Sequence, residues 1–382
     1  MDASLTLEHL PDDLDLAVLA GRVWQDGGPL PVIVRGGDVI DVSRTVATIS
    51  DLIDHPDRTV LEGPRLCTVT DLVAPGGARA GSVLSPIDLQ CIKAAGVTFA
   101  VSAIERVIEE RAQGDADRAA AIRAELEGRV GSSVRQVQPG SDAANRLKGA
   151  LIDAGIWSQY LEVAIGPDAE VFTKAPILSS IGWGADIGVR SDSSWNNPEP
   201  EVVLIVDSAG YPRGATLGND VNLRDFEGRS ALLLGKAKDN NASCALGPFI
   251  RLFDAHFGMD DVRAAQVTLR IDGVDGYRLD GHSSMREISR DPEELVRQTL
   301  SEHQYPDGFA LFLGTLFAPI QDRDTPGYGF THKLGDVVTI RSAQLGALIN
   351  RVTTSAQAAP WTFGVRALMH TLAARQMASA EG

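Results

Sequence analysis

Two glutamates stand at the entry to a strongly apolar stretch in the middle of the chain. Glu199 and Glu201 are separated by one residue, and the run at 202–206 (Val-Val-Leu-Ile-Val) is typical of a buried strand. Side chains of a strand alternate between its two faces, so both carboxylates would point to the same side. Two like charges there destabilise a fold unless a positive partner lies between them, which favours a bound divalent cation. The alternative is a solvated acidic edge.

A third carboxylate follows at a spacing that suits a hairpin. Asp220 comes 19 residues after Glu201, within Gly-Asn-Asp-Val-Asn-Leu-Arg-Asp at 218–225, and this length allows a strand, a turn and a return. Three hard oxygen ligands with open positions suit Mg²⁺, Mn²⁺ or Ca²⁺ better than zinc. Lys236 and Lys238 follow shortly, although the chain has only six lysines, and they predict a site for an anionic substrate. The alternative is an exposed basic turn.

The charge balance argues against one class of partner. The chain of 382 residues has a net charge of −16 at pH 7, which would repel the phosphate backbone of a nucleic acid. Its longest uncharged apolar stretch, 308–321, is shorter than the ~20 residues that span a bilayer. The acidic first residues are unlike a signal peptide, and three scattered cysteines suggest neither disulfides nor a thiolate zinc site. We therefore expect a cytoplasmic protein that binds neither membranes nor nucleic acid.

Hydrophobic periodicity predicts an α+β chain and not an alternating βαβ chain. The predicted strands are 30–34, 38–42, 202–206, 266–271, 309–314 and 336–341, with short extended pieces dominating 162–206. The predicted helices are 103–130 with a break at Gly114, 141–155, 291–303 capped by Asp291 and Pro292, and 362–376. Opposite charges three and four residues apart at 103–130 indicate a solvated helix pair.

The order of several motifs resembles the fumarylacetoacetate hydrolase superfamily. The Glu-x-Glu pair, the segment 218–225, a Gly-Lys at 235–236 and a Leu-Gly-Pro-Phe at 246–249 follow one another as they do in that family. Three further pieces resemble its Phe-x-Lys-x-Pro segment, its Gly-Thr-Pro turn and its Gly-Asp-Val strand, and these are 172–176, Gly314-Thr315 and 334–338.

The resemblance covers approximately residues 84–355, and it implies both a fold and a metal site. The implied fold is a β-rich mixed roll at 84–382, preceded by a small β-rich domain at 1–83. The implied cofactor is Mg²⁺ or Mn²⁺, held by Glu199, Glu201 and Asp220, with a 2-oxo acid on its open side. Such a cation acidifies the C3 hydrogens of the acid and stabilises the enolate that forms. From that enolate, either water splits a carbon–carbon bond or a hydroxyl at C4 leaves as water.

The segment at 96–105 helps to choose between these two reactions. In hydrolytic members of the family this segment resembles Asn-Tyr-x-x-His-x-x-Glu, where the histidine and the glutamate activate water. Here Ser102 stands for the histidine and Glu105 for the glutamate. A serine hydroxyl cannot accept a proton near neutral pH, so hydrolysis is disfavoured. The alternative for Glu105 is a solvated position on the charged helix.

Loss of water needs a base near C3 and an acid near C4. Glu170 is the first candidate base, because its place resembles a catalytic glutamate of the family's sugar-acid dehydratases; the alternative is a surface turn. Lys236 would stabilise the enolate or the substrate carboxylate, and Glu105 is the third catalytic candidate. The residues expected to bind substrate are Ser102, Lys174, Asn222, Arg224 and Thr315, the last by donating a hydrogen bond to the carboxylate.

Taken together, the motifs look most like the 2-keto-3-deoxy-pentonate dehydratases of this superfamily. That resemblance implies conversion of a 2-keto-3-deoxy-D-xylonate or -arabonate to 2-oxoglutarate semialdehyde in oxidative pentose breakdown, by a homodimer or higher homo-oligomer. Two alternatives stay open. One is an acylpyruvate hydrolase or a 2-oxo acid decarboxylase of the same superfamily, and the other is an inactive protein that binds metal and a 2-oxo acid.

Overall fold

The computed structural model describes residues 4–75, 80–113, 115–127, 134, 137–315, 317, 321–325 and 329–380. Its strands are β1 (Leu19–Gln25), β2 (Gly28–Arg35), β3 (Asp38–Asp41), β4 (Arg65–Thr68), β5 (Ser82–Val83), β6 (Cys91–Gly96), β7 (Glu170–Ala175), β8 (Asp186–Val189), β9 (Asn196–Asn197), β10 (Pro200–Val206), β11 (Pro212–Asp220), β12 (Asn222–Leu223), β13 (Cys244–Leu252), β14 (Gln266–Asp272), β15 (Arg278–Ser284), β16 (Phe309–Phe312), β17 (Val337–Ser342) and β18 (Gly346–Thr354). Its α-helices are α1 (Ile49–Asp54), α2 (Ala100–Ala112), α3 (Ala116–Glu127), α5 (Asp142–Asp153), α6 (Gln159–Ile165), α7 (Arg224–Glu227), α8 (Leu234–Lys238), α9 (Met259–Ala264), α10 (Pro292–Leu300) and α11 (Val365–Ala380). The predicted helix break at Gly114 lies outside the described residues.

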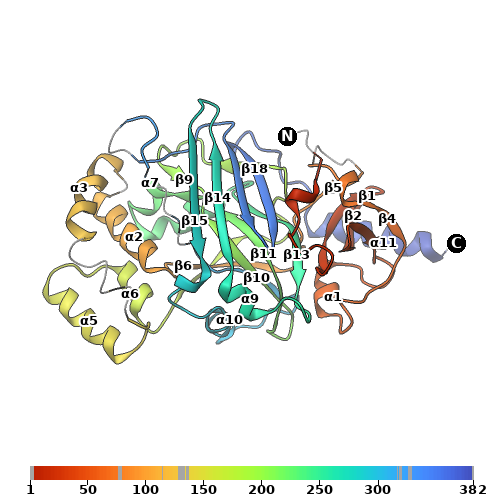
Figure 1. Cartoon of the computed structure of the whole chain (residues 1–382), viewed down its shortest axis with the longest axis horizontal. Helices are drawn as coiled ribbons and strands as arrows, with labels where there is room; N and C mark the ends of the chain where they lie inside the picture. Colours follow the sequence, from red (N-terminus) through yellow and green to blue (C-terminus); the bar gives the residue numbers. More distant parts are fainter. Residues whose placement is uncertain are drawn as a thin grey trace.

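Two sheets form the body of the molecule (Figure 1). Within the described ranges, eleven strands pair in the order β4-β3-β2-β1-β13-β11-β10-β16-β6-β7, with β5 on β1, and five pair in the order β15-β14-β17-β18-β8. Most neighbours are antiparallel, but β16 with β6 and β18 with β8 are parallel. The predicted α+β class, with strands dominating, is therefore confirmed.

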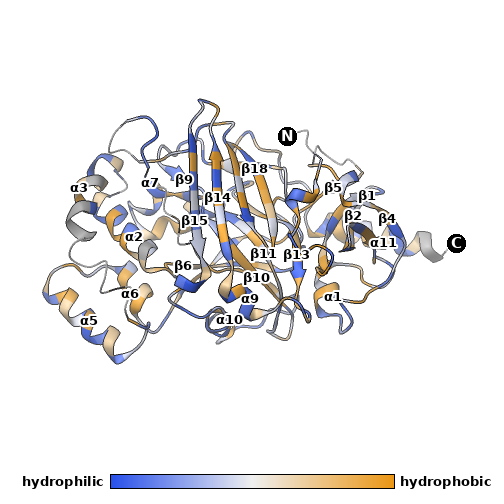
Figure 2. Cartoon of the chain, viewed as in Figure 1, coloured by the Kyte–Doolittle hydropathy of each residue, from blue (hydrophilic) through white to orange (hydrophobic). Residues whose placement is uncertain are grey.

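The central strand β10 is buried on both faces. Val202 and Leu204 belong to the core that also contains residues of β14 and β17, whereas Val203 and Ile205 belong to a second core under α1. A strand covered on both sides reads as a continuous apolar run, which is why the sequence predicted it well. In contrast, β14 alternates exposed and buried residues because one of its faces meets solvent (Figure 2).

The helices α2, α3, α5 and α6 gather at one end of the sheets and share a third core (Figure 1). The predicted charged pair at 103–130 is present as α2 and α3, but the expectation that it is solvated is wrong for α2. Glu105 and Glu109 are buried, and the Arg106 side chain is largely covered. These side chains form ion pairs inside the protein, so charge patterning alone does not reveal which face of a helix meets water.

Short extended pieces are predicted from residue 162 onward, but residues 162–165 form the end of helix α6. α6 starts directly after Ser158, whose hydroxyl accepts the N–H of Tyr160 (3.2 Å) and so caps the first turn. The remaining predicted elements agree with the structure to within a few residues at their ends.

The N-terminal strands lie at the opposite end from the helices (Figure 1). β1 pairs with β13, so these strands extend the central sheet, and Arg375 of α11 donates a hydrogen bond to Pro29 O (2.7 Å). The predicted division into two domains at residues 83/84 stays a prediction.

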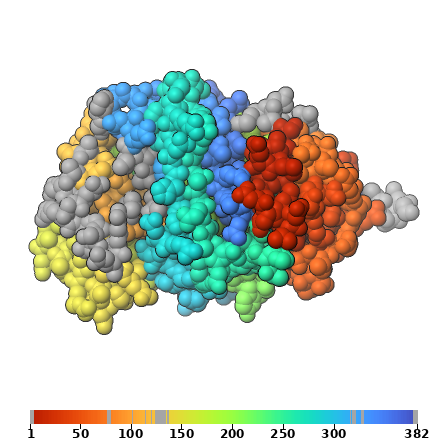
Figure 3. Space-filling model, in the orientation of Figure 1, coloured from red at the N-terminus to blue at the C-terminus, as the bar shows by residue number. Residues whose placement is uncertain are grey.

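Figure 3 shows the hairpin β14–β15 between the two ends on one face of the molecule. In the described part of the chain, no helix has the length and apolarity needed to cross a membrane.

Candidate metal centre and active site

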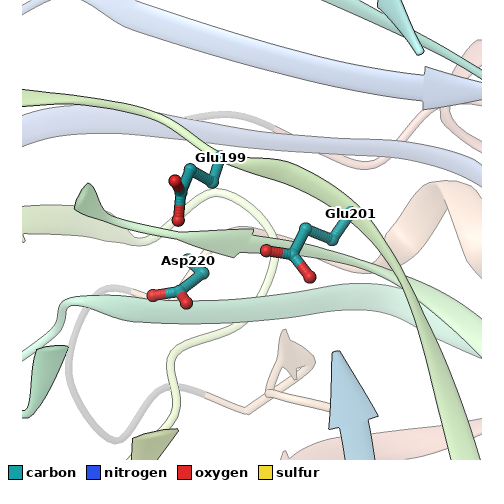
Figure 4. Close-up of side chains that lie close together, drawn as sticks. All are labelled: Glu199, Glu201 and Asp220. Atoms are coloured by element: carbon teal, nitrogen blue, oxygen red, sulfur yellow. The ribbon is translucent and has the colours of Figure 1, made fainter. Parts of the chain in front are cut away.

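The three predicted metal ligands converge at one end of a hairpin. β10 and β11 are antiparallel with Pro200 opposite Asn219, and the Asp220 N–H donates to Glu199 O (3.0 Å), so these two acids face each other. Glu201 lies two residues further along β10 and projects to the same side. One oxygen from each of the three carboxylates lies within 4.8 Å of the other two (Figure 4).

The triad is buried, and its charges are only partly compensated. Burial, together with Asp220 and Glu199, raises the pKa of Glu201 well above its usual range. Burial would also raise the pKa of Asp220, but Lys174 and Lys238 outweigh it and hold that pKa below its ordinary value. Glu201 accepts the Gly314 N–H (2.6 Å). A compact set of carboxylate oxygens with excess negative charge fits a hard divalent cation, so these residues suit Mg²⁺ or Mn²⁺.

Lys238 is the cation closest to the triad. Its Nζ lies 2.7 Å from Glu199 Oε2, 3.1 Å from Asp220 Oδ2 and 3.5 Å from Glu227 Oε1. Burial would lower the pKa of this amine, but the surrounding carboxylates raise it well above its usual range. Lys238 therefore stays charged, and it lines the same cavity as the acids.

Arg106 supports the triad from α2. One guanidinium nitrogen lies 2.9 Å from Glu199 Oε1, and the other lies 2.5 Å from Glu227 Oε2 and 2.9 Å from Glu109 Oε2. Arg224 adds an ion pair to Glu109 (3.1 Å). Such a network fixes the carboxylate of Glu199 in one orientation.

Seven of the residues singled out in the sequence line one cavity. They are Ser102, Glu170, Glu199, Glu201, Asp220, Lys238 and Thr315. Glu170 starts β7 opposite Gly96 of β6, so it lies in a strand and not in the surface turn considered as the alternative. A Cβ at position 96 would lie 2.1 Å from Glu170 Oε2, so any larger residue there would displace this carboxyl group from its present position. Burial raises the pKa of Glu170, and Arg106 opposes the rise.

Five other candidates lie behind or outside the cavity wall. Lys236 lies over the ring of Phe226 (5.2 Å), because on a helix it points away from the side that carries Lys238. Glu105 forms a two-bond pair with Arg123 (2.9 and 2.7 Å).

The remaining three candidates support the centre from behind. Lys174 is fully buried, with Nζ 2.9 Å from Asp220 Oδ1, and it also donates to Lys238 O. Asn222 accepts from Arg106 (3.2 Å), and Arg224 lies over the Trp195 ring. None of these three residues lines the cavity, so the structure does not place them in contact with a substrate there. Their contacts support a role in positioning the charged groups.

Sequence reasoning did not select Arg106, Glu227, Tyr160 or Phe172, which also line the cavity. Arg106 directly follows the chosen Glu105, and one residue on a helix turns the side chain by about 100°. The available signal was the spacing of Ser102 and Arg106, which are four apart and share a face.

This fold and this site define a class of protein: a sheet-dominated α+β protein with a buried three-carboxylate centre for a hard divalent cation. The chain belongs to the fumarylacetoacetate hydrolase family, because the family model described as "Fumarylacetoacetate (FAA) hydrolase C-terminal" matches residues 163–353. The resemblance that the motifs indicated is thereby confirmed.

Two curated relatives match part of the chain. It is 32% identical over 183 residues to the "2-dehydro-3-deoxy-D-arabinonate dehydratase" of Saccharolobus solfataricus, an alignment that covers 48% of this chain and 58% of the relative. It is 31% identical over 195 residues to the "Probable 2-keto-3-deoxyxylonate dehydratase" of Haloferax volcanii, covering 51% of this chain and 64% of the relative. The chain thus spans less than two thirds of the length of each relative.

Solved structures support the fold. A "2-keto-3-deoxy-D-arabinonate dehydratase apo form" matches with a TM-score of 0.62 at 22% identity, covering 88% of this chain and 99% of the other. The same TM-score, at 23% identity and with the same coverage, is found for a structure described as "complexed with magnesium and 2,5-dioxopentanoate". At these identities the matches establish the fold, and they confirm the expected mixed roll.

Proposed function

We propose that the protein is a divalent-cation-dependent dehydratase that converts a 2-keto-3-deoxy-pentonate, of the D-arabinonate or D-xylonate series, to 2,5-dioxopentanoate (2-oxoglutarate semialdehyde). The names of both curated relatives support this activity, and so does the ligand named in one of the matching structures. The observation that carries the proposal is the shared cavity of the acidic triad and Glu170, whose described lining contains no histidine.

The triad would hold the cofactor. Bound by Glu199, Glu201 and Asp220, Mg²⁺ or Mn²⁺ supplies Lewis-acid chemistry that acidifies the C3 hydrogens of a 2-oxo acid. Lys238 lines the same cavity and balances the negative charge of a substrate carboxylate or enolate. Thr315 Oγ accepts the Phe317 N–H (3.1 Å), and its hydroxyl proton has no acceptor within the described residues, so it can be donated to a substrate carboxylate.

Glu170 is the proton-transfer group of this proposal. Because burial raises its pKa, this carboxyl group exchanges protons closer to neutral pH than an ordinary glutamate does. It takes the proton from C3 and returns it to the hydroxyl that leaves C4, so one water is lost and a C3–C4 double bond forms. A proton then moves from C5 to C3, which gives a C4–C5 enol, and this enol becomes the 5-aldehyde when its hydroxyl proton moves to C4.

Hydrolysis of a carbon–carbon bond is disfavoured at this site. Ser102 occupies the place of the hydrolytic histidine, and its hydroxyl donates to Thr315 O. A serine hydroxyl is too weak a base to take a proton from water near neutral pH. Release of pyruvate or CO₂ from a 2,4-dioxo acid would indicate an acylpyruvate hydrolase or a decarboxylase instead.

A substrate panel tests the proposal. Purified protein with Mg²⁺ is incubated with 2-keto-3-deoxy acids of both pentonate series, and the product is followed by mass spectrometry and by a coupled NAD(P)-linked semialdehyde dehydrogenase. We expect 2,5-dioxopentanoate from at least one pentonate, and none with the Glu201→Gln variant. Binding of a 2-oxo acid in calorimetry without turnover of any acid would contradict the proposal and indicate an inactive binding protein.

The finer statements from the sequence also remain proposals. A homodimer or larger homo-oligomer and a cytoplasmic location are expected from the resemblance and from the composition. Light scattering of the purified chain measures the first, and fractionation of the source cells measures the second.

A further inference from the structure

A second and larger cavity lies away from the acidic triad. It has a volume of about 320 Å³, and none of the residues that line it lines the first cavity. Its wall is built from β1 and β2, from Pro75, Leu84 and Ser85, from residues 178–182 and 184–186, from Asn241 and Ala242, and from residues 359–363 before α11. Volumes of this order are typical of small-molecule sites.

One buried cation belongs to this wall. Arg22, on β1, is only 6% exposed. Within the described ranges its guanidinium makes a single hydrogen bond, from Nε to Ser85 O (2.9 Å), and no ion pair. The carboxylate of Asp88 acts on it from a distance, but its oxygens accept the N–H groups of Ile49 (2.6 Å) and Ser50 (3.1 Å).

The charge of Arg22 is therefore poorly compensated. Burial lowers its pKa, and Asp88 offsets this only in part, yet an arginine side chain stays protonated in proteins. Four N–H donors on the terminal nitrogens remain without a partner among the described residues. A guanidinium fork matches a carboxylate with two parallel hydrogen bonds, so these donors suit an organic anion.

The rest of the wall does not repel an anion. Asp186 is the acidic residue among the lining residues, and it is held by Arg351 in a two-bond pair (2.9 and 3.0 Å). Ser85 and Ser180 share a hydrogen bond (2.7 Å). These groups leave Arg22 as the only net charge of the described lining.

Three aromatic residues also line the cavity. Trp24 and Phe363 pack edge to face with their centroids 5.5 Å apart, and Trp361 lines the wall with 46% of its surface exposed. Trp361 Nε1 donates to Phe363 O (2.9 Å), and Asn241 holds the segment by donating to Ala359 O (3.2 Å). Rings in this arrangement favour a flat apolar group.

We propose that this cavity binds a small organic monocarboxylate with a planar apolar body. The carboxylate pairs with the guanidinium of Arg22, and the body packs against Trp24, Trp361 and Phe363. The site is separate from the proposed dehydratase centre and does not depend on that activity.

A matched pair of probes tests the charge requirement. We use 2-naphthoate and its neutral amide, 2-naphthamide, titrated into the full-length protein with EDTA present, and we follow binding by calorimetry and tryptophan fluorescence. The expected result is one site for naphthoate and at least tenfold weaker binding of the amide, because only the carboxylate pairs with Arg22. Equal affinities for the two probes would overturn the proposal.

Three variants locate the binding. Arg22→Met should weaken naphthoate binding at least tenfold, and Trp361→Ala should weaken it less while leaving the buried cation in place. Glu201→Gln, in the other cavity, should leave naphthoate affinity unchanged. The site would be contradicted if naphthoate affinity were unchanged in Arg22→Met and Trp361→Ala, or if it were lost in Glu201→Gln. If one of the variants fails to fold, the results for the others still decide the question.

Light scattering supplies a further check on the occupant. If a second copy of the chain covers this cavity, naphthoate will not bind, and Trp361→Ala will lower the oligomeric mass. That outcome would show that a second copy of the chain, and not a small organic anion, occupies this cavity. It would therefore overturn the proposal.

Discussion

The two cavities handle buried charge in opposite ways. In the metal centre, Arg106 and Lys238 are surrounded by acids, and each of them has two or more ion pairs within 3.5 Å. In the second cavity, Arg22 has one hydrogen bond to a carbonyl and no ion pair among the described residues. The first arrangement is a framework that positions acidic groups, whereas the second leaves a cation without an ionic partner among the described residues. Four substitutions test this contrast.

The largest effect is expected from Glu201→Gln. This change removes one of three carboxylates and leaves an amide where a hard cation needs an anionic oxygen. We expect Mg²⁺-dependent turnover to fall by at least about 10³-fold, more than the roughly 10–100-fold typical for loss of an outer partner. Calorimetric titration with Mg²⁺ should show weaker binding in parallel, and full Mg²⁺ affinity in this variant would refute the ligand assignment.

The next effect is a loss of stability in Arg106→Met. Removal of this cation leaves Glu199, Glu227 and Glu109 with fewer positive partners in a buried place, which costs about 3–5 kcal/mol of unfolding free energy. Urea unfolding without metal measures it. The double variant Arg106→Met/Glu227→Gln should recover part of the loss, since one of the unpaired charges is then absent. A loss below 1 kcal/mol in the single variant would mean that Arg106 is not a structural counter-charge.

A smaller effect on turnover is expected from Gly96→Ala. The new Cβ would lie 2.1 Å from Glu170 Oε2, so the flexible carboxyl group must move while the backbone stays in place. Turnover should fall about tenfold or more, because misplacement of a reacting group by about 1 Å has a large effect on rate. Gly149→Ala in α5 is the matched control, because no atom lies within 4 Å of its new Cβ, and it should leave turnover unchanged. Equal turnover in the two variants would argue against Glu170.

The smallest effect is expected from Arg22→Met without ligand. Arg22 has no ion pair among the described residues, so replacing it with an apolar side chain removes a desolvation cost along with one hydrogen bond. The unfolding free energy should stay within about 1 kcal/mol of the unchanged protein, in contrast to Arg106→Met. A loss as large as that of Arg106→Met would show that Arg22 is compensated within the fold.

Local patterns predicted the strands and the acidic triad well. The apolar run at 202–206 and the two glutamates before it indicate a buried strand and one carboxylate face, and a hairpin of ordinary length brings in Asp220. These inferences depend on the period of two along a strand, which the sequence shows directly.

The other site residues depend on contacts that no local pattern contains. Choosing between Lys236 and Lys238, or between Glu105 and Arg106, requires knowing which side of a short helix faces the sheet. The surroundings of Arg22 come from segments more than 150 residues apart, and neither its burial nor its missing partner can be seen in the sequence around it.

The hairpin that carries the triad has its irregularity at the far end. The β10–β11 pairing is regular from Pro200 to Ile205, and the register shifts only between Ile205 and Val206, next to the turn at 207–211. Additions or deletions in that turn would therefore be absorbed before they reach Glu199 and Asp220. The tip of this hairpin is thus a place to attach a tag or a reporter while the metal ligands keep their alignment.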